Sequence, residues 1–250
     1  MGGYMYLKIV KKTAKEIFSI CKKPIVSSSL IYGANENYWV PGKKKFSLVM
    51  NDFQSDRLKL LSKFVDQTCV ASIIDLGAGD GALDSALAEK YPGIKIKCFD
   101  RSHISVSQLR KSGMEAHVLD IEESFDDIPP ADLMIGFEIL EHLRCPEQVL
   151  VSLLNKSKVG LAFSVPNTGY YTHRLRLFLG YFPLQWHSHP GEHLRFWTLK
   201  DMRFWMTQLD IDSSCKISII PYQGHPFLGY FFPNLFHEGI FVFIQKKVPR

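Results

Sequence analysis

The sequence predicts an α/β fold: one doubly wound, mostly parallel sheet of seven strands with helices on both faces. Two observations predict it. An apolar run that begins at Ile73 ends in three closely spaced glycines, and a helix-like segment follows at 82–90. From there to residue 165, strand-like and helix-like segments alternate, as they do in repeated βα units. The 250 residues, 46% of them hydrophobic, suffice for one substantial core.

The individual elements follow from periodicity and from the residues at their ends. Apolar residues at helical spacing predict a helix over 52–65, before the first strand. Further helices are expected over 82–90, 104–112, 146–156 and 198–209, the last with Thr198 as its cap. Strands are expected around Ile73 and over 94–100, 114–120, 131–137, 158–165, 216–221 and 239–247.

The N-terminal region has a different character. Residues 6–23 predict an amphipathic helix with lysines on one side and apolar residues on the other. Such a helix either lies on an anionic membrane surface or packs on the domain with its lysines in water. Residues 25–50 are rich in loop-forming residues, so we expect a boundary near residue 66, with a helical and loop region over 1–66 and the main domain over 67–250.

Composition bounds the partners and the compartment. The formal charge of +5 is small, which disfavours a nucleic acid as the partner without excluding it. Five scattered cysteines without a C-x-x-C pair indicate reduced thiols, and the early residues show no apolar secretion signal. We therefore expect a cytoplasmic protein, peripheral to the membrane if residues 6–23 bind lipid. Nothing in the sequence indicates the oligomeric state.

The glycine turn is G-x-G-x-G, formed by Gly77, Gly79 and Gly81, with Asp75 just before it. Glycines let backbone approach a ligand closely, and the helix that follows points N–H groups toward an anionic group. The spacing differs from the G-x-G-x-x-G of dinucleotide-binding proteins. The turn resembles the cofactor loop of class I S-adenosylmethionine (SAM) methyltransferases, whose Rossmann-like sheet has the seven strands expected here.

That resemblance implies roles for acids at the ends of neighbouring strands. Asp100 ends the second strand, where a carboxylate can accept both ribose hydroxyl hydrogens. Asp120 with Ile121 would lie beside adenine, although an acid that merely starts a loop is the alternative for Asp120. Asp75 would contact the methionine end of SAM. The resemblance also places three further residues at the cofactor: Ala78, Arg101 and Phe137.

A second motif, E-x-x-E-H, follows the fourth strand as Glu138, Glu141 and His142. The i, i+3, i+4 spacing would place all three on one face of a helical turn. Together with His193, which precedes an aromatic-Thr helix start, the motif resembles two metal-using families. These are the ubiquinone-biosynthesis O-methyltransferases and the Hen-type small-RNA 2′-O-methyltransferases.

The resemblance implies four ligands for a divalent cation such as Mg²⁺: Glu138, Glu141, His142 and His193. It also makes Glu138, His142 and His193 candidate catalytic residues. In the metal-free alternative, the glutamates pair locally and His142 or His193 is a plain general base.

The acceptor is expected to bind between the fifth strand and the last long helix. Aromatic side chains crowd that region: Tyr170, Tyr171, Phe178, Tyr181, Phe182, Trp186, Phe196 and Trp197. They would suit a hydroxylated small molecule or a glycan, unless part of them is simply core. Residues 164–180 also resemble MetW-like proteins of methionine biosynthesis, which implies an alternative role as the SAM-binding partner of an acyltransferase. RNA 2′-O-methylation is the other alternative.

Overall fold

The structure is a computed structural model that describes residue 20 and residues 46–123, 127–185, 193–209, 211 and 215–247. Within these residues a seven-stranded sheet has the order β3-β2-β1-β4-β5-β7-β6. The first five strands are parallel, and β7 is antiparallel to both β5 and β6. The strands are β1 (Ser72–Leu76), β2 (Lys95–Asp100), β3 (Glu115–Val118), β4 (Ala131–Phe137), β5 (Ser157–Pro166), β6 (Cys215–Gly224) and β7 (His237–Lys246). The fold class expected from the sequence is confirmed.

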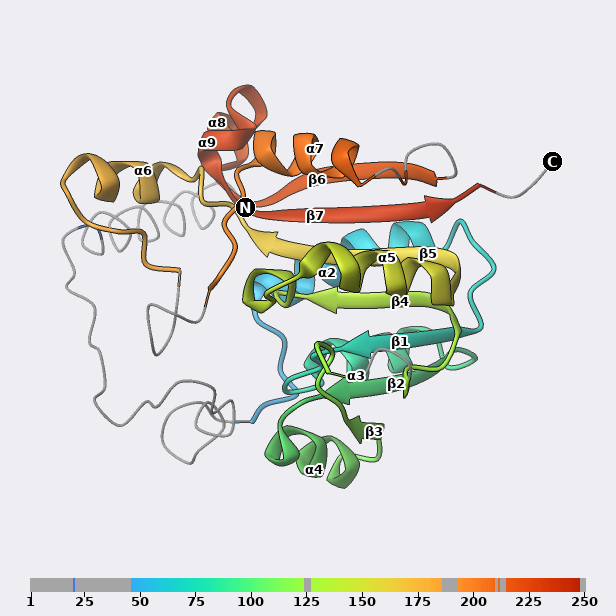
Figure 1. Ribbon diagram of the computed structural model, residues 1–250. Coiled ribbons are helices and arrows are strands. Elements are labelled where there is room, and N and C mark those ends of the chain that lie inside the picture. The colour runs from blue at the N-terminus through green and yellow to red at the C-terminus, as the bar shows by residue number, and fades with distance from the viewer. Residues whose placement is uncertain are drawn as a thin grey trace.

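Helices cover both faces of this sheet, as Figure 1 shows for α5 in front of it and α2 behind it. The helices are α2 (Asp52–Val65), α3 (Ala82–Lys90), α4 (His103–Lys111), α5 (Pro146–Lys156), α6 (Tyr171–Phe178), α7 (Leu199–Gln208), α8 (Pro226–Phe231) and α9 (Pro233–Phe236). One turn of 3₁₀ helix, η3, covers Leu140–His142.

Alternation along the strands produces two main cores, one on each face of the sheet, and a smaller third cluster joins β2 and β3 to α4. Ile73 of β1 faces a cluster with residues of α2 and α3, while its neighbour Ile74 faces a cluster with residues of α5 and α7. Successive side chains of a strand point to opposite faces, so a strand covered on both sides is apolar throughout. This explains why the buried strands show continuous apolar runs in the sequence.

The helices expected after residue 50 are present, with small shifts at their ends. Thr198 caps α7 as expected, through a capping box with Asp201. The third strand ends at Val118, short of the expected Asp120. The reason is that the Asp120 carboxylate accepts the N–H of Glu122 at 2.9 Å, which begins a turn. Helices α6, α8 and α9 were not expected.

Most of the N-terminal region lies outside the described residues, including residues 6–23 except Ile20. Ile20 is helical and buried, and its carbonyl accepts a hydrogen bond from the Arg176 guanidinium of α6 at 2.6 Å. The 1–66 and 67–250 division stays a prediction. Among the described helices, none combines the length and the apolar character that a bilayer crossing requires.

Candidate active site at the carboxyl ends of the strands

The glycine turn after β1 has the backbone that its sequence requires. Gly77, Gly79 and Gly81 have φ values of +72°, +59° and +69°, in the left-handed region that favours glycine. The Gly77 N–H donates to the Phe99 carbonyl at 2.6 Å, which holds the turn against β2. A Cβ atom on Gly77 would lie 2.5 Å from Cδ1 of Ile139. Both backbone conformation and space therefore require glycine there.

Asp100 is bound directly to this turn. It is the last residue of β2, as expected, and one carboxylate oxygen accepts the Gly79 N–H at 3.0 Å. The other oxygen accepts the N–H of Ser102 at 2.8 Å. Burial raises the pKa of Asp100, and these two backbone donors oppose that shift. Each carboxylate oxygen has a second lone pair, so Asp100 retains the capacity to accept two ligand hydroxyls.

A second acid, Asp84 on α3, lies beside Asp75 of β1. Both side chains are buried, and their carboxyls are close enough to share a hydrogen bond when one is protonated. Burial is the main cause that raises the pKa of Asp84 to about 6, and burial together with Asp84 raises the pKa of Asp75. The protonation state of Asp75 therefore depends on that of Asp84, and the two carboxyls act as a pair.

The remaining predicted cofactor residues lie around the same edge of the sheet. Asp120 and Ile121 follow β3, and Ile121 lines an apolar cavity together with Leu76. Phe137 ends β4 and stacks on Phe241 of β7 with ring centroids 5.8 Å apart. Two further predicted residues differ in exposure: Ala78 is partly buried and Arg101 is exposed.

Three of the four predicted metal ligands come together. Glu141, His142 and His193 each offer a ligand atom, and these atoms lie within 4.8 Å of one another. Glu141 is 1% exposed, and among the described residues neither of its carboxylate oxygens has a hydrogen-bond partner. Nε2 of His142 lies 3.9 Å from Oε1 of Glu141, and the two imidazole rings are 4.7 Å apart. Burial is the main cause that raises the pKa of Glu141.

Backbone hydrogen bonds bring His193 to this position from fifty residues away in the chain. The N–H groups of Leu194 and Arg195 donate to the Glu141 carbonyl at 2.7 and 3.1 Å. The Arg195 guanidinium also donates to the Arg144 carbonyl. The segment after His193 is therefore fixed on the turn that carries Glu141 and His142.

Glu138 is not part of this group, and its expected place on one helical face with Glu141 and His142 is wrong. The helical turn η3 begins only at Leu140, and Glu138 has a φ of +57°. This backbone turns its side chain toward α2 and β5. Its Oε1 forms an ion pair with the Arg57 guanidinium at 2.8 Å and accepts a hydrogen bond from the Ser164 hydroxyl at 2.8 Å.

Arg57 is the main site residue that the sequence interpretation missed. It lies on the buried side of α2, and its Nε donates to the Tyr222 hydroxyl at 2.8 Å. Its guanidinium also lies 5.8 Å from the ring centres of Phe53, Phe137 and Tyr222. The sequence does contain a signal for its burial: Arg57 lies four residues from both Phe53 and Leu61, on the apolar stripe of the helix. A charged residue there needs a buried partner.

The aromatic side chains after β5 divide into two sets. Tyr170 and Trp197 are buried, as the core interpretation expects. Four others are exposed by 39% or more: Phe178, Tyr181, Phe182 and Phe196. Tyr171 is partly buried and belongs to neither set. Trp186 lies outside the described residues.

Comparisons with known proteins assign the chain to a sequence family and show solved structures with the same fold. The sequence profile of the O-methyltransferase domain family matches residues 31–158. Trans-aconitate 2-methyltransferase of Mycolicibacterium gilvum is 29% identical over 109 residues, which are 43% of this chain and 42% of that protein. Caffeic acid 3-O-methyltransferase 3 of Populus kitakamiensis is 32% identical over 93 residues, 35% of this chain and 25% of that protein. The chain thus spans less than half the length of these curated relatives.

Solved structures show the same fold. The methyltransferase domain of bacterial CtHen1-CN superposes with a TM-score of 0.57 at 16% identity, covering 78% of this chain and all of that one. The plantazolicin methyltransferase BpumL, solved with S-adenosylhomocysteine (SAH), superposes with a TM-score of 0.54 at 14% identity, covering 78% and 84%.

Proposed function

The chain belongs to the O-methyltransferase domain family, among the class I SAM-dependent methyltransferases, and from this we propose that it transfers a methyl group from SAM to a hydroxyl of a small molecule or glycan. The observation that carries this proposal is the left-handed glycine turn bound to Asp100. It presents backbone without side chains next to a buried carboxylate, at the end of the sheet where ligands of such folds bind.

In this proposal each acid binds a different part of SAM. Asp100 accepts the ribose hydroxyls through its remaining lone pairs, while Asp120 and Ile121 bind the adenine edge and face. Asp75 faces the ammonium group of the methionine end. That group would favour the ionised form of the Asp75–Asp84 pair, because a nearby positive charge lowers the pKa of a carboxyl.

The reaction needs a nucleophile in line with the sulfonium. The acceptor oxygen forms a bond to the methyl carbon, the carbon–sulfur bond breaks with its electrons on sulfur, and SAH leaves. The hydroxyl proton must go to a base, and His142 and His193 are the candidates because both lie at the open end of the strands. Orientation within an enclosed site supplies the rest of the rate.

The same residues fit a divalent cation. The two buried carboxylate oxygens of Glu141, which form no hydrogen bond within the described part of the chain, lie beside two imidazoles. This is a donor set suited to Mg²⁺, Mn²⁺ or Zn²⁺. We propose that Glu141, His142 and His193 hold such an ion. When bound, the ion supplies Lewis acidity that lowers the pKa of an acceptor hydroxyl.

Glu138 then has a different role from the one expected. Burial is the main cause that raises the pKa of Glu141; the charge of Glu138 adds to it, and the charge of Arg57 opposes it. We propose that Glu138 positions the turn that carries Glu141 and His142, through its contacts with Arg57 and Ser164. In this role Glu138 does not bind the ion itself but fixes the position of the residues that do.

Transfer from labelled SAM tests the activity. Purified protein should move label into a hydroxylated component of a cell extract, and removal of divalent cations with EDTA should suppress this until Mn²⁺ or Mg²⁺ is added. His193→Ala should lose activity, whereas His117→Ala, an exposed histidine of β3, should keep it. If label enters only nuclease-sensitive material, the acceptor class is wrong and RNA is the substrate.

A MetW-like partner role predicts a different result. Such a protein would raise the activity of an acyltransferase and bind SAM without transferring methyl groups. The grouping of Glu141, His142 and His193 favours catalysis, because a buried carboxylate with no hydrogen bond to the described residues is costly and a pure binding partner gains nothing from it. Activity lost on Glu141→Gln with SAM affinity kept would support the enzyme.

A further inference from the structure

Helix α6 is amphipathic in the reverse of the usual sense. Its buried residues are polar, Thr172 and Arg176, while its apolar residues face outward. Leu175, Phe178 and Leu179 have the i, i+3, i+4 spacing of one helix face, and Phe178 is 85% exposed. A helix on a globular domain normally buries its apolar face. The outward face of α6 is therefore built for an apolar surrounding.

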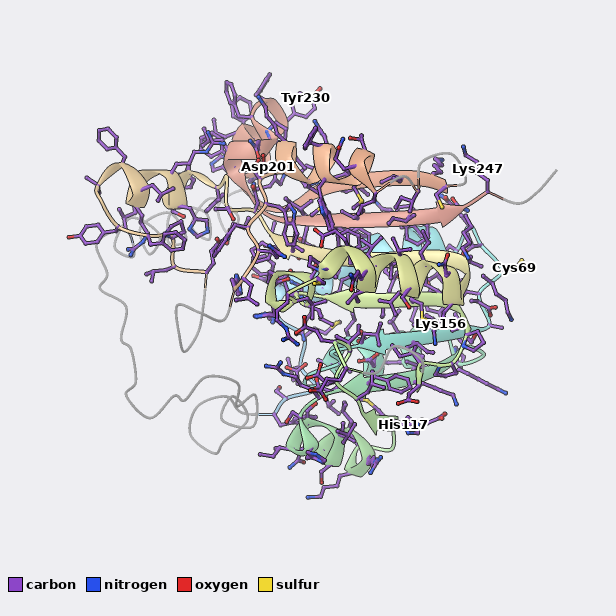
Figure 2. The ribbon with its side chains drawn as sticks, viewed as in Figure 1. Cys69, His117, Lys156, Asp201, Tyr230 and Lys247 are labelled. Atoms are coloured by element: carbon purple, nitrogen blue, oxygen red, sulfur yellow. The ribbon has the colours of Figure 1, made fainter. Side chains whose placement is uncertain are left out.

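Helix α8 shows the same reversal. Its buried residue is Gly229, and three of its aromatic side chains are exposed: Phe227 by 67%, Tyr230 by 80% and Phe231 by 59%. Phe232, directly after the helix, is exposed as well. Figure 2 shows Tyr230 projecting outward at one end of the molecule, far from His117 of the edge strand β3.

Ring contacts connect the start of α6 with the α8–α9 segment. Tyr171, the first residue of α6, lies 5.6 Å from Phe236, the last residue of α9, and Phe236 lies 6.4 Å from Phe232 (ring centroids). In Figure 1 the α6 and α8–α9 segments lie at the end toward which β1, β4 and β5 point. This is also the end of the sheet that carries the candidate active site. We call the exposed side chains of α6 and α8 the aromatic surface.

The two segments of the aromatic surface carry no negative charge, and the exposed charged groups around them are mostly basic. Residues 171–182 and 226–236 contain no acid, and Arg174 of α6 is exposed. Helix α7 adjoins α9 through the Leu199 N–H, which donates to the Asn234 side chain at 2.9 Å, and α7 exposes Lys200 and Arg203. Exposed Asp201 is the acid on that turn of α7. Basic groups beside protruding aromatic rings match a bilayer surface with anionic headgroups.

We propose that the aromatic surface docks on an anionic lipid bilayer, with Phe178, Phe227, Tyr230 and Phe231 inserted at the headgroup level. Phe and Tyr rings suit that depth, because they bury apolar area while a tyrosine hydroxyl stays hydrated. Exposed large apolar side chains that gather at one end of a molecule mark an interaction site. This docking places the open end of the candidate active site toward the bilayer.

Sedimentation with vesicles tests the proposal. Full-length protein should bind vesicles of phosphatidylcholine with phosphatidylglycerol, and should bind pure phosphatidylcholine more weakly. Tyr230→Ser combined with Phe231→Ser should weaken binding about tenfold, because two rings lose their burial. Phe178→Ser, which tests the contribution of α6, should also weaken vesicle binding. Val118→Ser, which removes an exposed apolar residue from the opposite edge strand β3, should leave it unchanged.

Two results would overturn the proposal. One is absent vesicle binding, or equal binding by the double variant and the unaltered protein. The other is a dimer in light scattering that the double variant abolishes without any vesicle binding, which would assign the surface to a second copy of the chain. Circular dichroism and the unfolding midpoint verify that each variant is folded. The substituted side chains are exposed, so both should match the unaltered protein.

Discussion

The carboxylate of Asp100 accepts the backbone N–H of Gly79 at 3.0 Å, so the acid that ends β2 is bound to the turn that follows β1. One side chain thereby serves the shape of the glycine turn and remains able to accept ligand hydroxyls. Asp100→Asn should weaken SAM binding by more than tenfold, since hydrogen bonds to a charged acceptor contribute about 1.5–3 kcal/mol.

Titration calorimetry with SAM measures this, and Glu115→Gln on β3, an exposed acid, is the control. Unchanged SAM affinity in Asp100→Asn would contradict the assignment of the ribose to this carboxylate.

The glycine turn yields a prediction with a built-in comparison. Gly77→Ala places a methyl group 2.5 Å from Ile139 at a φ of +72° and should abolish detectable SAM binding. Gly113→Ala has a φ of +83° but open space, so it should cost only the strain, about 1–2 kcal/mol of stability. Gly93→Ala meets neither problem and should be neutral. Thermal unfolding with and without SAM separates the three.

Removing Arg57 should destabilise the fold strongly. Arg57→Met leaves the partly buried Glu138 without its cation and Tyr222 without its donor, and breaking a buried pair costs about 3–5 kcal/mol. Adding Glu138→Gln should recover part of the loss. Lys59→Met, which removes an exposed pair with Asp56 on the same helix, should change stability by less than about 1 kcal/mol. Urea denaturation of these variants tests the coupling.

Glu141 should lower the stability of the metal-free protein. Two buried oxygens that accept no hydrogen bond from the residues that the structure describes carry a desolvation cost, so Glu141→Leu should stabilise the metal-free protein by about 1–3 kcal/mol. The same variant should lose any rise in Tm that Mn²⁺ gives the unaltered protein. A destabilised Glu141→Leu, with the Mn²⁺ response kept, would place the ion elsewhere.

The Asp75–Asp84 pair predicts how stability depends on pH. Burial raises the pKa of Asp84 from 3.8 to about 6, so the folded state binds more protons than the unfolded state between these values. The contribution of Asp84 therefore falls as pH rises from about 4 to about 6, by about 3 kcal/mol at most, and is constant above that. Asp84→Asn should gain stability at pH 7.5 and lose this slope. Urea unfolding at pH 5 and 7.5 measures both.

Local sequence was enough to predict the sheet and the glycine turn. Apolar runs of strand length, helical spacing and three glycines are properties of short segments, so α3 and α5 begin and end at the expected residues. The strand that ends in Asp100 follows from the same kind of information.

The rest depends on contacts between distant segments. Arg57 and Tyr222 are 165 residues apart in the chain, and no local pattern in either segment predicts that the two side chains are partners. The left-handed backbone at Glu138 broke the expected helical face, because helical spacing carries meaning only if the helix has begun. The reversed burial of α6 hides it from any method that expects apolar residues inside.

The contacts of α2 also set where the chain can be shortened. A protein beginning at residue 67 would keep every strand, every glycine of the turn and every acid at a strand end. It would lose the cation that Glu138 and Tyr222 share, and the Gln54 amide that donates to Asp80 of the glycine turn at 3.0 Å. The smallest piece that preserves the site therefore starts at or before Asn51, the residue that caps α2.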